Sequence, residues 1–277
     1  PMPGRPMALA HADWNGDGKQ DFAVYVEKPV AVPPTPFQLF IYMGNGDGTF
    51  VAPMAPVLWD PTETKYLTYF LAGDVNGDGK QDIVASSIRR IANDESKLEV
   101  LFGNGDGTFA PSQVYGLCRS HFLILQDFNG DGKLDVFGKA SDPTLGGYCM
   151  LFQQADKSFQ PNSSWLLPQR RFYNMNFADW NGDGKLDLIG VVDAFTGNRN
   201  ENNLPPNLVV YAMDGKGGFL QSDVQPATRG PSWFPDGLVI ADLNRDGKLD
   251  VVVANGKRGT ISMYLANRAG ALVKKPD

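Results

Sequence analysis

Short apolar runs alternate along the chain with polar stretches rich in Asp, Asn and Gly. The runs contain many β-branched and aromatic residues, as strands do, and no segment shows sustained helical periodicity. Three sets of predicted strands recur in the same order: residues 7–12, 67–73, 122–126, 173–178 and 238–241; then 22–26, 83–86, 136–139, 188–192 and 251–254; then 38–43, 98–102, 148–152, 208–213 and 260–265. With an outer strand after the third, each repeat is predicted to have four antiparallel strands.

One nine-residue pattern, Asp-x-Asn-x-Asp-Gly-Lys-x-Asp, separates the first and second strands of every repeat. Its copies are residues 13–21, 74–82, 127–135, 179–187 and 242–250, and successive copies start 61, 53, 52 and 63 residues apart. Four antiparallel strands repeated radially are the arrangement of a β-propeller. We therefore expect an all-β, five-bladed propeller with this loop between the first and second strands of each blade. It is expected to form a single domain over residues 1–277, with repeats near 1–58, 59–115, 116–166, 167–225 and 226–277.

The nine-residue pattern predicts a calcium site. Side-chain oxygens at positions 1, 3, 5 and 9 and the backbone carbonyl of position 7 suit a hard cation that takes about six to eight oxygen ligands. Glycine at position 6 permits the sharp turn that folds these oxygens inward. About five structural Ca²⁺ ions are expected on this basis. The predicted ligands, with each lysine acting through its backbone carbonyl, are Asp13, Asn15, Asp17, Lys19 and Asp21; Asp74, Asn76, Asp78, Lys80 and Asp82; Asp127, Asn129, Asp131, Lys133 and Asp135; Asp179, Asn181, Asp183, Lys185 and Asp187; and Asp242, Asn244, Asp246, Lys248 and Asp250.

The loops differ from EF-hands, because position 12 never carries the bidentate Glu. That position holds Val24, Ala85, Gly138, Gly190 or Val253, so position 9 is expected to complete the ligand shell. Fifteen of the 31 acidic residues are loop aspartates, so the net charge of −6 becomes +9 without them and +4 with five bound Ca²⁺. The acidic balance therefore gives no argument for basic partners. Because clustered carboxylates repel one another, we expect chelators to destabilise the protein.

The loop and the turn after the third strand together resemble a known repeat family. In the second repeat, Asp-Val-Asn-Gly-Asp-Gly-Lys-Gln-Asp at 74–82 is followed by Leu-Phe-Gly-Asn-Gly-Asp-Gly-Thr-Phe at 101–109. These motifs resemble the FG-GAP/VCBS repeats, the calcium-bearing propeller blades of integrin α-subunits, many secreted bacterial proteins and certain fungal fruit-body lectins. The resemblance covers nearly the whole chain. It departs in blade number, since well-known members have about seven, and at Arg245, which replaces Gly at position 4 of the fifth loop.

The remaining candidate chemistry lies in the turns and the variable loops. Asp47 and Asp106, in the two Asn-Gly turns, are not expected to bind metal because neither turn has further carboxylates at ligand spacing. The loops on the opposite face of the predicted disc vary, and variable loops on a rigid scaffold commonly carry binding sites. Packing between blades explains large side chains there equally well. The candidate ligand-binding residues in these loops are Trp59, Arg119, Arg171, Trp233 and Phe234.

No catalytic constellation is evident in the sequence. Glycosidases of this architecture need carboxylates on the innermost strands, and none of the five first strands contains Asp or Glu. His11 and His121 are the only histidines, so no catalytic zinc site is expected, and no nucleic-acid-binding motif is present. We therefore predict that the chain is not an enzyme but a calcium-stabilised recognition or adhesion module that binds a protein partner or assembles with other subunits. The alternatives are a calcium-dependent lectin that binds glycans in inter-blade grooves, and a non-catalytic accessory domain of a secreted enzyme.

Calcium sites of this kind are most useful where calcium is plentiful, so a secreted, extracellular or periplasmic location is expected. No apolar run is long enough to span a membrane. The chain opens without a signal-like segment, so a leader is expected to be absent or already removed. Cys118 and Cys149 are both predicted on the variable face of the third repeat, which suits either a disulfide or two buried thiols.

Overall fold

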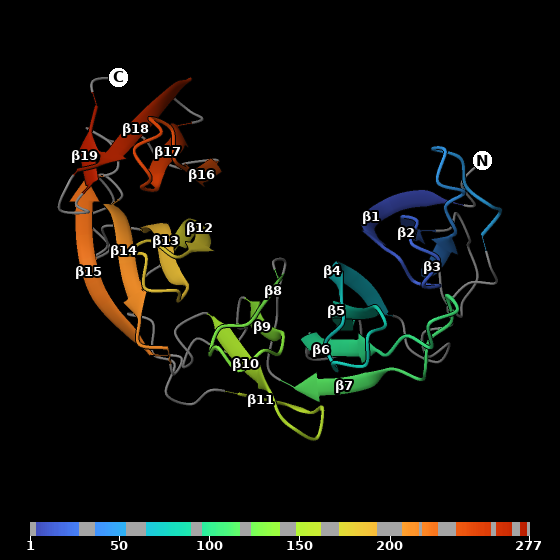
Figure 1. Cartoon of the computed structure of the whole chain (residues 1–277). Coiled ribbons are helices and arrows are strands. Elements are labelled where there is room, and N and C mark those ends of the chain that lie inside the picture. The colour runs from blue at the N-terminus through green and yellow to red at the C-terminus, as the bar shows by residue number, and fades with distance from the viewer. Residues whose placement is uncertain are drawn as a thin grey trace. The chain divides into compact units, whose positions relative to one another are not determined.

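The computed structural model describes residues 4–27, 37–53, 65–89, 96–116, 123–138, 148–161, 172–192, 207–215, 218–226, 237–255, 259–267 and 272–275. Every regular element in these ranges is a β-strand, and the strands form five antiparallel sheets of three or four strands each (Figure 1). Within each sheet, neighbouring strands pair in the order in which they follow one another along the chain. The prediction of an all-β fold is confirmed.

The chain divides into two compact units, Pro1–Asp127 with Asp131–Asn162, and Phe128–Gly130 with Ser163–Asp277. The first unit contains three sheets, made of β1 (Arg5–Ala12), β2 (Asp21–Glu27) and β3 (Phe37–Tyr42); β4 (Lys65–Gly73), β5 (Asp82–Arg89), β6 (Ser96–Leu101) and β7 (Gln113–Gly116); and β8 (Leu123–Gln126), β9 (Asp135–Gly138), β10 (Cys149–Gln153) and β11 (Phe159–Pro161). The second unit contains two sheets, made of β12 (Phe172–Ala178), β13 (Asp187–Val192), β14 (Asn207–Met213) and β15 (Phe219–Pro226); and β16 (Gly237–Ala241), β17 (Asp250–Asn255), β18 (Thr260–Ala266) and β19 (Leu272–Lys274).

Each sheet corresponds to one sequence repeat. The three sets of predicted strands are all present, and the outer strand is present in four of the sheets; the first sheet has three strands among the described residues. The apolar runs thus locate the strands correctly, because each run is long enough for one strand and is bounded by a polar turn. The assembly of the five sheets into one closed propeller, and hence a single domain over residues 1–277, stays a prediction.

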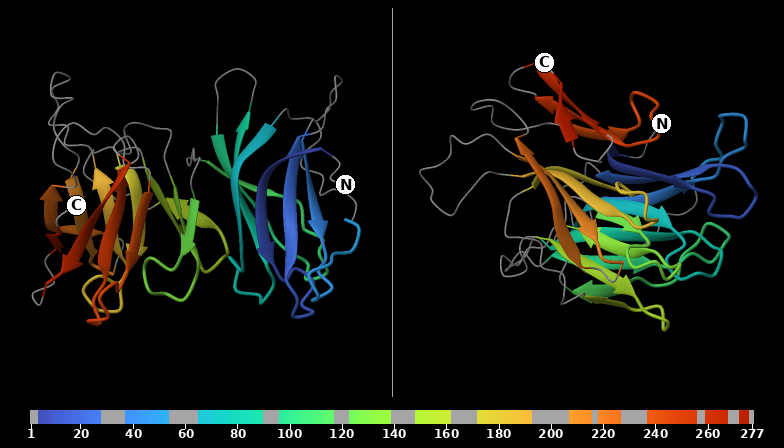
Figure 2. Two further views of the ribbon diagram at one scale, coloured as in Figure 1. Left: turned by 90° about the horizontal axis from the view of Figure 1, so that it is seen from above. Right: turned by 60° about the vertical axis from the view of Figure 1, so that its left-hand side comes forward.

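Each nine-residue loop closes the hairpin between the first and second strands of its sheet. Its ninth residue is the first residue of the second strand and pairs with the last residue of the first strand. These pairs are Ala12 with Asp21, Gly73 with Asp82, Gln126 with Asp135, Ala178 with Asp187 and Ala241 with Asp250. Because the sheets are meanders, the loop and the turn after the third strand lie at the same end of the sheet (Figure 2, left).

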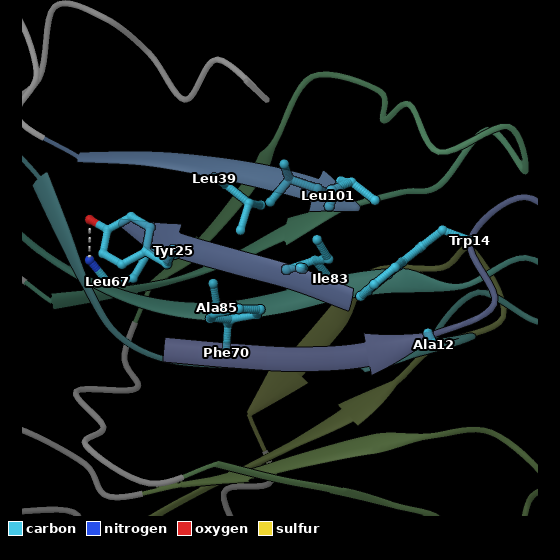
Figure 3. Packing of buried hydrophobic residues seen from close by; sticks show 11 residues of the cluster. Ala12, Trp14, Tyr25, Leu39, Leu67, Phe70, Ile83, Ala85 and Leu101 are labelled. Carbon is cyan, nitrogen blue, oxygen red and sulfur yellow. Dashed lines mark hydrogen bonds between the residues drawn. The ribbon is translucent and has the colours of Figure 1, made fainter. Parts of the chain in front are cut away.

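The apolar cores lie between neighbouring sheets within each unit. Between the first two sheets, Trp14 and Leu39 pack against Phe70, Ile83 and Leu101 (Figure 3). A second cluster joins the second and third sheets, and a third joins the two sheets of the second unit. Alternate residues of a middle strand thus serve different cores, as the two-residue period of a strand requires. In β5, for example, Ile83 faces the first cluster and Val84 the second.

A buried tyrosine links the first two sheets by a hydrogen bond. The register of β4 against β5 shifts between Leu67 and Tyr69, which is a β-bulge. The backbone N–H of Leu67 donates to the Tyr25 hydroxyl oxygen at 2.9 Å (Figure 3). Burial raises the pKa of Tyr25 well above its usual range. The bulge therefore has its N–H satisfied by a side chain of the neighbouring sheet.

Candidate metal centres

All five nine-residue loops lie within the described residues, and they share one pattern of hydrogen bonds. In the first loop, Asp13 Oδ1 accepts from the backbone N–H of Asp17 at 3.2 Å, and Asp13 Oδ2 accepts from that of Gly18 at 2.8 Å. Asp17 Oδ1 accepts in turn from the N–H of Lys19 at 2.9 Å. The same three bonds occur in the other four loops, at 2.7–3.2 Å. The side chains at positions 1 and 5 are thus turned toward the loop's own backbone.

Left-handed backbone at two positions makes this turn possible. Gly at position 6 has φ between 79° and 84° in all five loops. Position 4 is also left-handed, and in the fifth loop it is occupied by Arg245, with φ 61°. A residue with a Cβ is disfavoured in this region. The fifth loop nevertheless keeps the hydrogen bonds of the others, so the replacement of Gly at position 4 does not change the fold of the loop.

The aspartate at position 9 is buried in every loop, with no more than 1% of its surface exposed. In the first loop, Asp21 Oδ2 accepts from the backbone N–H of Trp14, at position 2, at 2.9 Å. Asp21 Oδ1 accepts from the N–H of Gly44, just after the third strand, at 2.8 Å. The bond to the third strand recurs in all the other loops, at 2.8–3.0 Å. One carboxylate thus holds the loop and the third strand together.

Burial also changes the acidity of these groups. It raises the pKa of Asp82 to about 6, although the N–H groups of Gly103 and Val75 act in the opposite direction. Burial likewise raises the pKa of Asp187. By contrast, hydrogen bonding by the backbone N–H of Lys19 lowers the pKa of the exposed Asp17. A cation beside the buried carboxylate would favour its charged form.

The turn after the third strand is fitted closely to the loop in the first two repeats. A Cβ on Gly44 would lie 2.1 Å from the carbonyl oxygen of Gln20, and a Cβ on Gly103 would lie 2.2 Å from that of Gln81. Gln20 and Gln81 occupy position 8 of their loops. Only glycine allows the two backbones to approach this closely.

A comparison with models of protein families matches the repeats of the chain. A model described as an FG-GAP-like repeat matches residues 13–85, 74–138, 127–190 and 189–253. Three of these matches begin at the first aspartate of a loop. The chain belongs to the FG-GAP repeat family. The resemblance seen in the loop and turn motifs is thereby confirmed, and each match begins in one sheet and ends in the second strand of the next sheet along the chain.

Solved structures align with this FG-GAP chain over most of its length at low identity. RS223-β-xylosidase is 13% identical over 98% of this chain and 95% of its own, with a TM-score of 0.44. A GH43_1 enzyme from Xanthomonas citri is 10% identical over 97% of this chain and 90% of its own, with a TM-score of 0.41. The exotype rhamnogalacturonan lyase YesX is 12% identical over 91% of this chain and 56% of its own, with a TM-score of 0.40. A search of curated proteins finds no match to the sequence.

These likenesses contradict two predictions from the sequence. The chain was expected not to be an enzyme and to be an adhesion module, with a lectin or a non-catalytic accessory domain as alternatives, yet glycosidases and a lyase are among the structures that align with it. The sequence argument rested on the absence of Asp and Glu from the first strands, and this absence tests only one placement of catalytic carboxylates. Alignments with TM-scores of 0.40–0.44 assign neither a reaction nor a substrate to this chain.

Position 2 of the FG-GAP loop is a further structural residue, and the sequence reasoning missed it. Trp14 and Val75 are buried in the cores that join their own sheet to the next one, and Trp180 packs against the core of the second unit. Phe128 stacks edge-on against Phe177, with 4.7 Å between ring centroids. The fifth copy, Leu243, is 43% exposed. The sequence feature that could have indicated this structural role is the apolar residue at position 2 in all five copies.

The lysine at position 7 also has a side-chain role that the pattern did not suggest. A Cβ on Gly46 would lie 3.3 Å from Lys19 Cδ, and a Cβ on Gly105 would lie 3.2 Å from Lys80 Cδ. The lysine stem therefore covers a glycine of the turn after the third strand. The sequence feature that could have indicated this role is the lysine at position 7 of all five copies. A metal would need only the backbone carbonyl oxygen of that position, which any residue supplies.

The donor set of each loop fits a hard cation. Three carboxylates, one amide oxygen and one carbonyl oxygen are all oxygen ligands, which Ca²⁺ prefers. Each carboxylate oxygen has about two lone pairs, so position-1 Oδ2 and position-5 Oδ1, which each accept one backbone N–H, keep a lone pair for a metal. Position-1 Oδ1 accepts two backbone N–H groups in the first, second and fourth loops. In the described part of the chain, no three His, Cys, Asp or Glu side chains are gathered around one point. Binding would thus require the side chains of the loop to rotate toward a common point.

Asp47 and Asp106 have local partners in their turns. Asp47 Oδ1 accepts from the backbone N–H of Thr49 at 2.9 Å and from its hydroxyl at 2.6 Å. Asp106 makes the same two bonds to Thr108. The hydroxyl bonds lower the pKa of both aspartates. These residues therefore stabilise the turn itself.

The predicted ligand-binding residues of the variable loops all fall outside the described residues, namely Trp59, Arg119, Arg171, Trp233 and Phe234. Their role stays a prediction from the sequence. Cys149 is disulfide-bonded, and the chain's other cysteine, Cys118, lies outside the described residues. The described ranges contain no helix that could cross a membrane.

Proposed function

We propose that the chain is a calcium-binding FG-GAP repeat protein in which each of the five loops holds one Ca²⁺. The observation that carries this proposal is the identical fold of the five loops, in which the side chains at positions 1 and 5 are turned inward by the same hydrogen bonds. The all-oxygen donor set supports calcium rather than zinc or copper, which favour nitrogen and sulfur ligands.

The metal would act on stability. Each loop carries three carboxylates within nine residues of sequence, and a cation that drew them to one point would offset their mutual repulsion. The buried aspartate at position 9 links the loop to the start of the second strand and the end of the third. A cation held by the loop would therefore stabilise the junction of three strands in each sheet.

The proposal also bears on location. Extracellular calcium modules bind with dissociation constants of about 10⁻⁴–10⁻³ M, whereas cytosolic sensors bind at about 10⁻⁷–10⁻⁵ M. The five loops lack the bidentate Glu that completes EF-hand shells, which favours affinities in the weaker range. We therefore propose that the protein works outside the cytoplasm, where calcium is plentiful. A dissociation constant in the micromolar range or below would contradict this.

The experiment that tests calcium binding removes one ligand at a time. Asp78→Ala removes the carboxylate at position 5 of the second loop. In the unaltered protein, Asp78 Oδ1 accepts a hydrogen bond from one backbone N–H, that of Lys80. The bound calcium should fall by one ion per chain, as measured by native mass spectrometry or by equilibrium dialysis with elemental analysis. Asp106→Ala is the control, because Asp106 is also exposed and its Oδ1 also accepts a backbone N–H, at 2.9 Å, in addition to the Thr108 hydroxyl. Equal stoichiometry in Asp78→Ala and the unaltered protein would overturn the assignment of this loop.

A further inference from the structure

The five loop lysines do not direct their ammonium groups to the same partner. Lys185 Nζ donates to the carbonyl oxygen of Asp214 at 3.3 Å, and Lys248 Nζ donates to that of Asn267 at 2.5 Å. Both acceptors lie in the turn after the third strand. A Cβ on Gly215 would lie 2.9 Å from Lys185 Cε, so the fourth repeat has the same lysine packing as the first two.

The third repeat differs. Lys133 Nζ donates to Asp131 Oδ2 at 2.8 Å, within its own loop. The turn after its third strand carries Ala155 where the first, second and fourth repeats have Gly46, Gly105 and Gly215. It also has a different backbone, since Lys157 is its one left-handed residue and the N–H of Lys157 donates to Gln154 O.

The outer oxygen at position 5 therefore has two kinds of partner. In the second, fourth and fifth loops, Oδ2 accepts from the neutral amide of the asparagine at position 3, at 3.0–3.3 Å. In the third loop it accepts from the Lys133 ammonium at 2.8 Å. The first loop is intermediate, because Lys19 Nζ lies 3.4 Å from Asp17 Oδ2. A charged donor holds a carboxylate more strongly than a neutral one.

We propose that Lys133 competes with the cation for Asp131, so that the third loop binds calcium more weakly than the second loop. This inference rests on the proposed calcium function. Asp131 is one of the three carboxylates of its loop, and an ammonium at hydrogen-bonding distance must move before Oδ2 can coordinate a metal. Filling of the loops is then graded, with the third loop last and the first loop between it and the other three.

The test is Lys133→Met, with Lys157→Met as its control, because Lys157 is an exposed lysine of the same repeat that lies outside the loop. Methionine keeps an unbranched apolar stem and removes the charge, and the backbone carbonyl at position 7 is unaffected. The position-6 glycines report each loop separately, because the N–H of Gly132 donates to Asp127 Oδ2 and that of Gly79 donates to Asp74 Oδ2. Their amide signals are followed by NMR during a titration of metal-free protein with calcium.

We expect half-saturation of the Gly132 signal at the higher calcium concentration in the unaltered protein. Lys133→Met should lower that concentration about two- to fivefold, the scale of an exposed ion pair. Lys157→Met should leave the midpoint of the Gly132 signal unchanged within about 1.5-fold, which excludes a general effect of removing one positive charge from the third repeat.

Two results would overturn the inference, and they differ from failure of the proposed function. An unchanged or higher Gly132 midpoint in Lys133→Met would show that the lysine does not compete. Equal midpoints of Gly132 and Gly79 in the unaltered protein would show that filling is not graded. If neither glycine responds to calcium in the unaltered protein, the calcium function of these loops fails and the inference fails with it.

Discussion

At the scale of single residues, the aspartate at position 9 explains why the loop pattern ends where it does. Asp187 Oδ1 accepts from the backbone N–H of Met213 and Oδ2 from that of Trp180, both at 3.0 Å, and the side chain is fully buried. Buried N–H groups left without acceptors are costly. This carboxylate therefore contributes to folding independently of any role as a metal ligand.

Asp187→Asn should destabilise the metal-free protein by about 1–3 kcal/mol, because the amide keeps one acceptor oxygen and leaves one buried N–H unpaired. Urea unfolding of calcium-free protein measures the change. The control Asp183→Asn alters an exposed residue of the same loop whose Oδ1 bond to the Lys185 N–H an amide oxygen can keep, so its cost should stay within about 0.5 kcal/mol. Equal effects of the two variants would contradict the structural role of position 9.

Tyr25 gives a second residue-scale prediction. Tyr25→Phe keeps the buried ring but removes the acceptor for the Leu67 N–H, and it should cost about 1–3 kcal/mol. The hydroxyl also predicts a pH dependence. Because burial raises the pKa of Tyr25 in the folded state, the unfolded chain loses this proton first. Its contribution is therefore complete below about pH 10 and declines as the pH rises further.

Denaturant unfolding of both proteins between pH 8 and 11 separates this residue from the other tyrosines. The difference in unfolding free energy between the unaltered protein and Tyr25→Phe should be constant up to about pH 10 and shrink above it. A difference that stays constant or grows above that pH would show that the tyrosine is not protected in the folded state.

At the scale of elements, every loop is joined to its own sheet, and the first, second and fourth loops also contact the core that their sheet shares with the next one. Position 9 bonds to the third strand, and position 2 enters the core between sheets. In the first unit, the carbonyl oxygen of Trp14 also accepts from the N–H of Gly107, in the turn of the second repeat, at 3.1 Å. The loop is therefore part of the packing between repeats as well as a candidate metal site.

Trp14 and Leu243 occupy the same loop position in different surroundings, 1% and 43% exposed. Trp14→Ala should cost about 3–5 kcal/mol, because it leaves a large cavity between two sheets. Leu243→Ala should cost less than about 1 kcal/mol. Thermal or urea unfolding in the presence of calcium measures both. Similar costs would mean that position 2 does not act through the core between sheets.

The sequence was sufficient to place the strands, because their apolar runs are short, strongly β-forming and bounded by polar turns. It also located the loops and the family, since the loop pattern keeps the same residue types in five copies. It did not reveal the inter-sheet role of Trp14 or the turn contact of Lys19, because both depend on elements distant in sequence. The third loop's ion pair was equally hidden, since Lys133 looks like every other position 7.

At the scale of the whole molecule, the structure consists of five sheets in two compact units, with cores between neighbouring sheets inside each unit. Within each unit, neighbouring repeats bury apolar faces against one another, so no sheet is expected to be stable by itself. Loops that stabilise individual hairpins should therefore affect cooperative unfolding of more than one repeat.

The prediction about activity failed at this scale for a physical reason. Function follows from the geometry of a site rather than from a fold, and repeats of one architecture occur in proteins of several classes. The sequence argument considered catalytic carboxylates only on the first strands and gave no information on other placements. The calcium assignment does not share this weakness, because all its ligands lie within nine consecutive residues.

The measurement that tests the central claim most directly is the number of calcium ions bound per chain. Metal-free protein is dialysed to equilibrium against about 5 mM CaCl₂, above the usual range for extracellular modules, and bound metal is determined by elemental analysis. Five ions per chain, with a melting temperature that falls on chelation, is the predicted result. Fewer than one ion per chain in folded protein, with no change in melting temperature on chelation, would contradict the account.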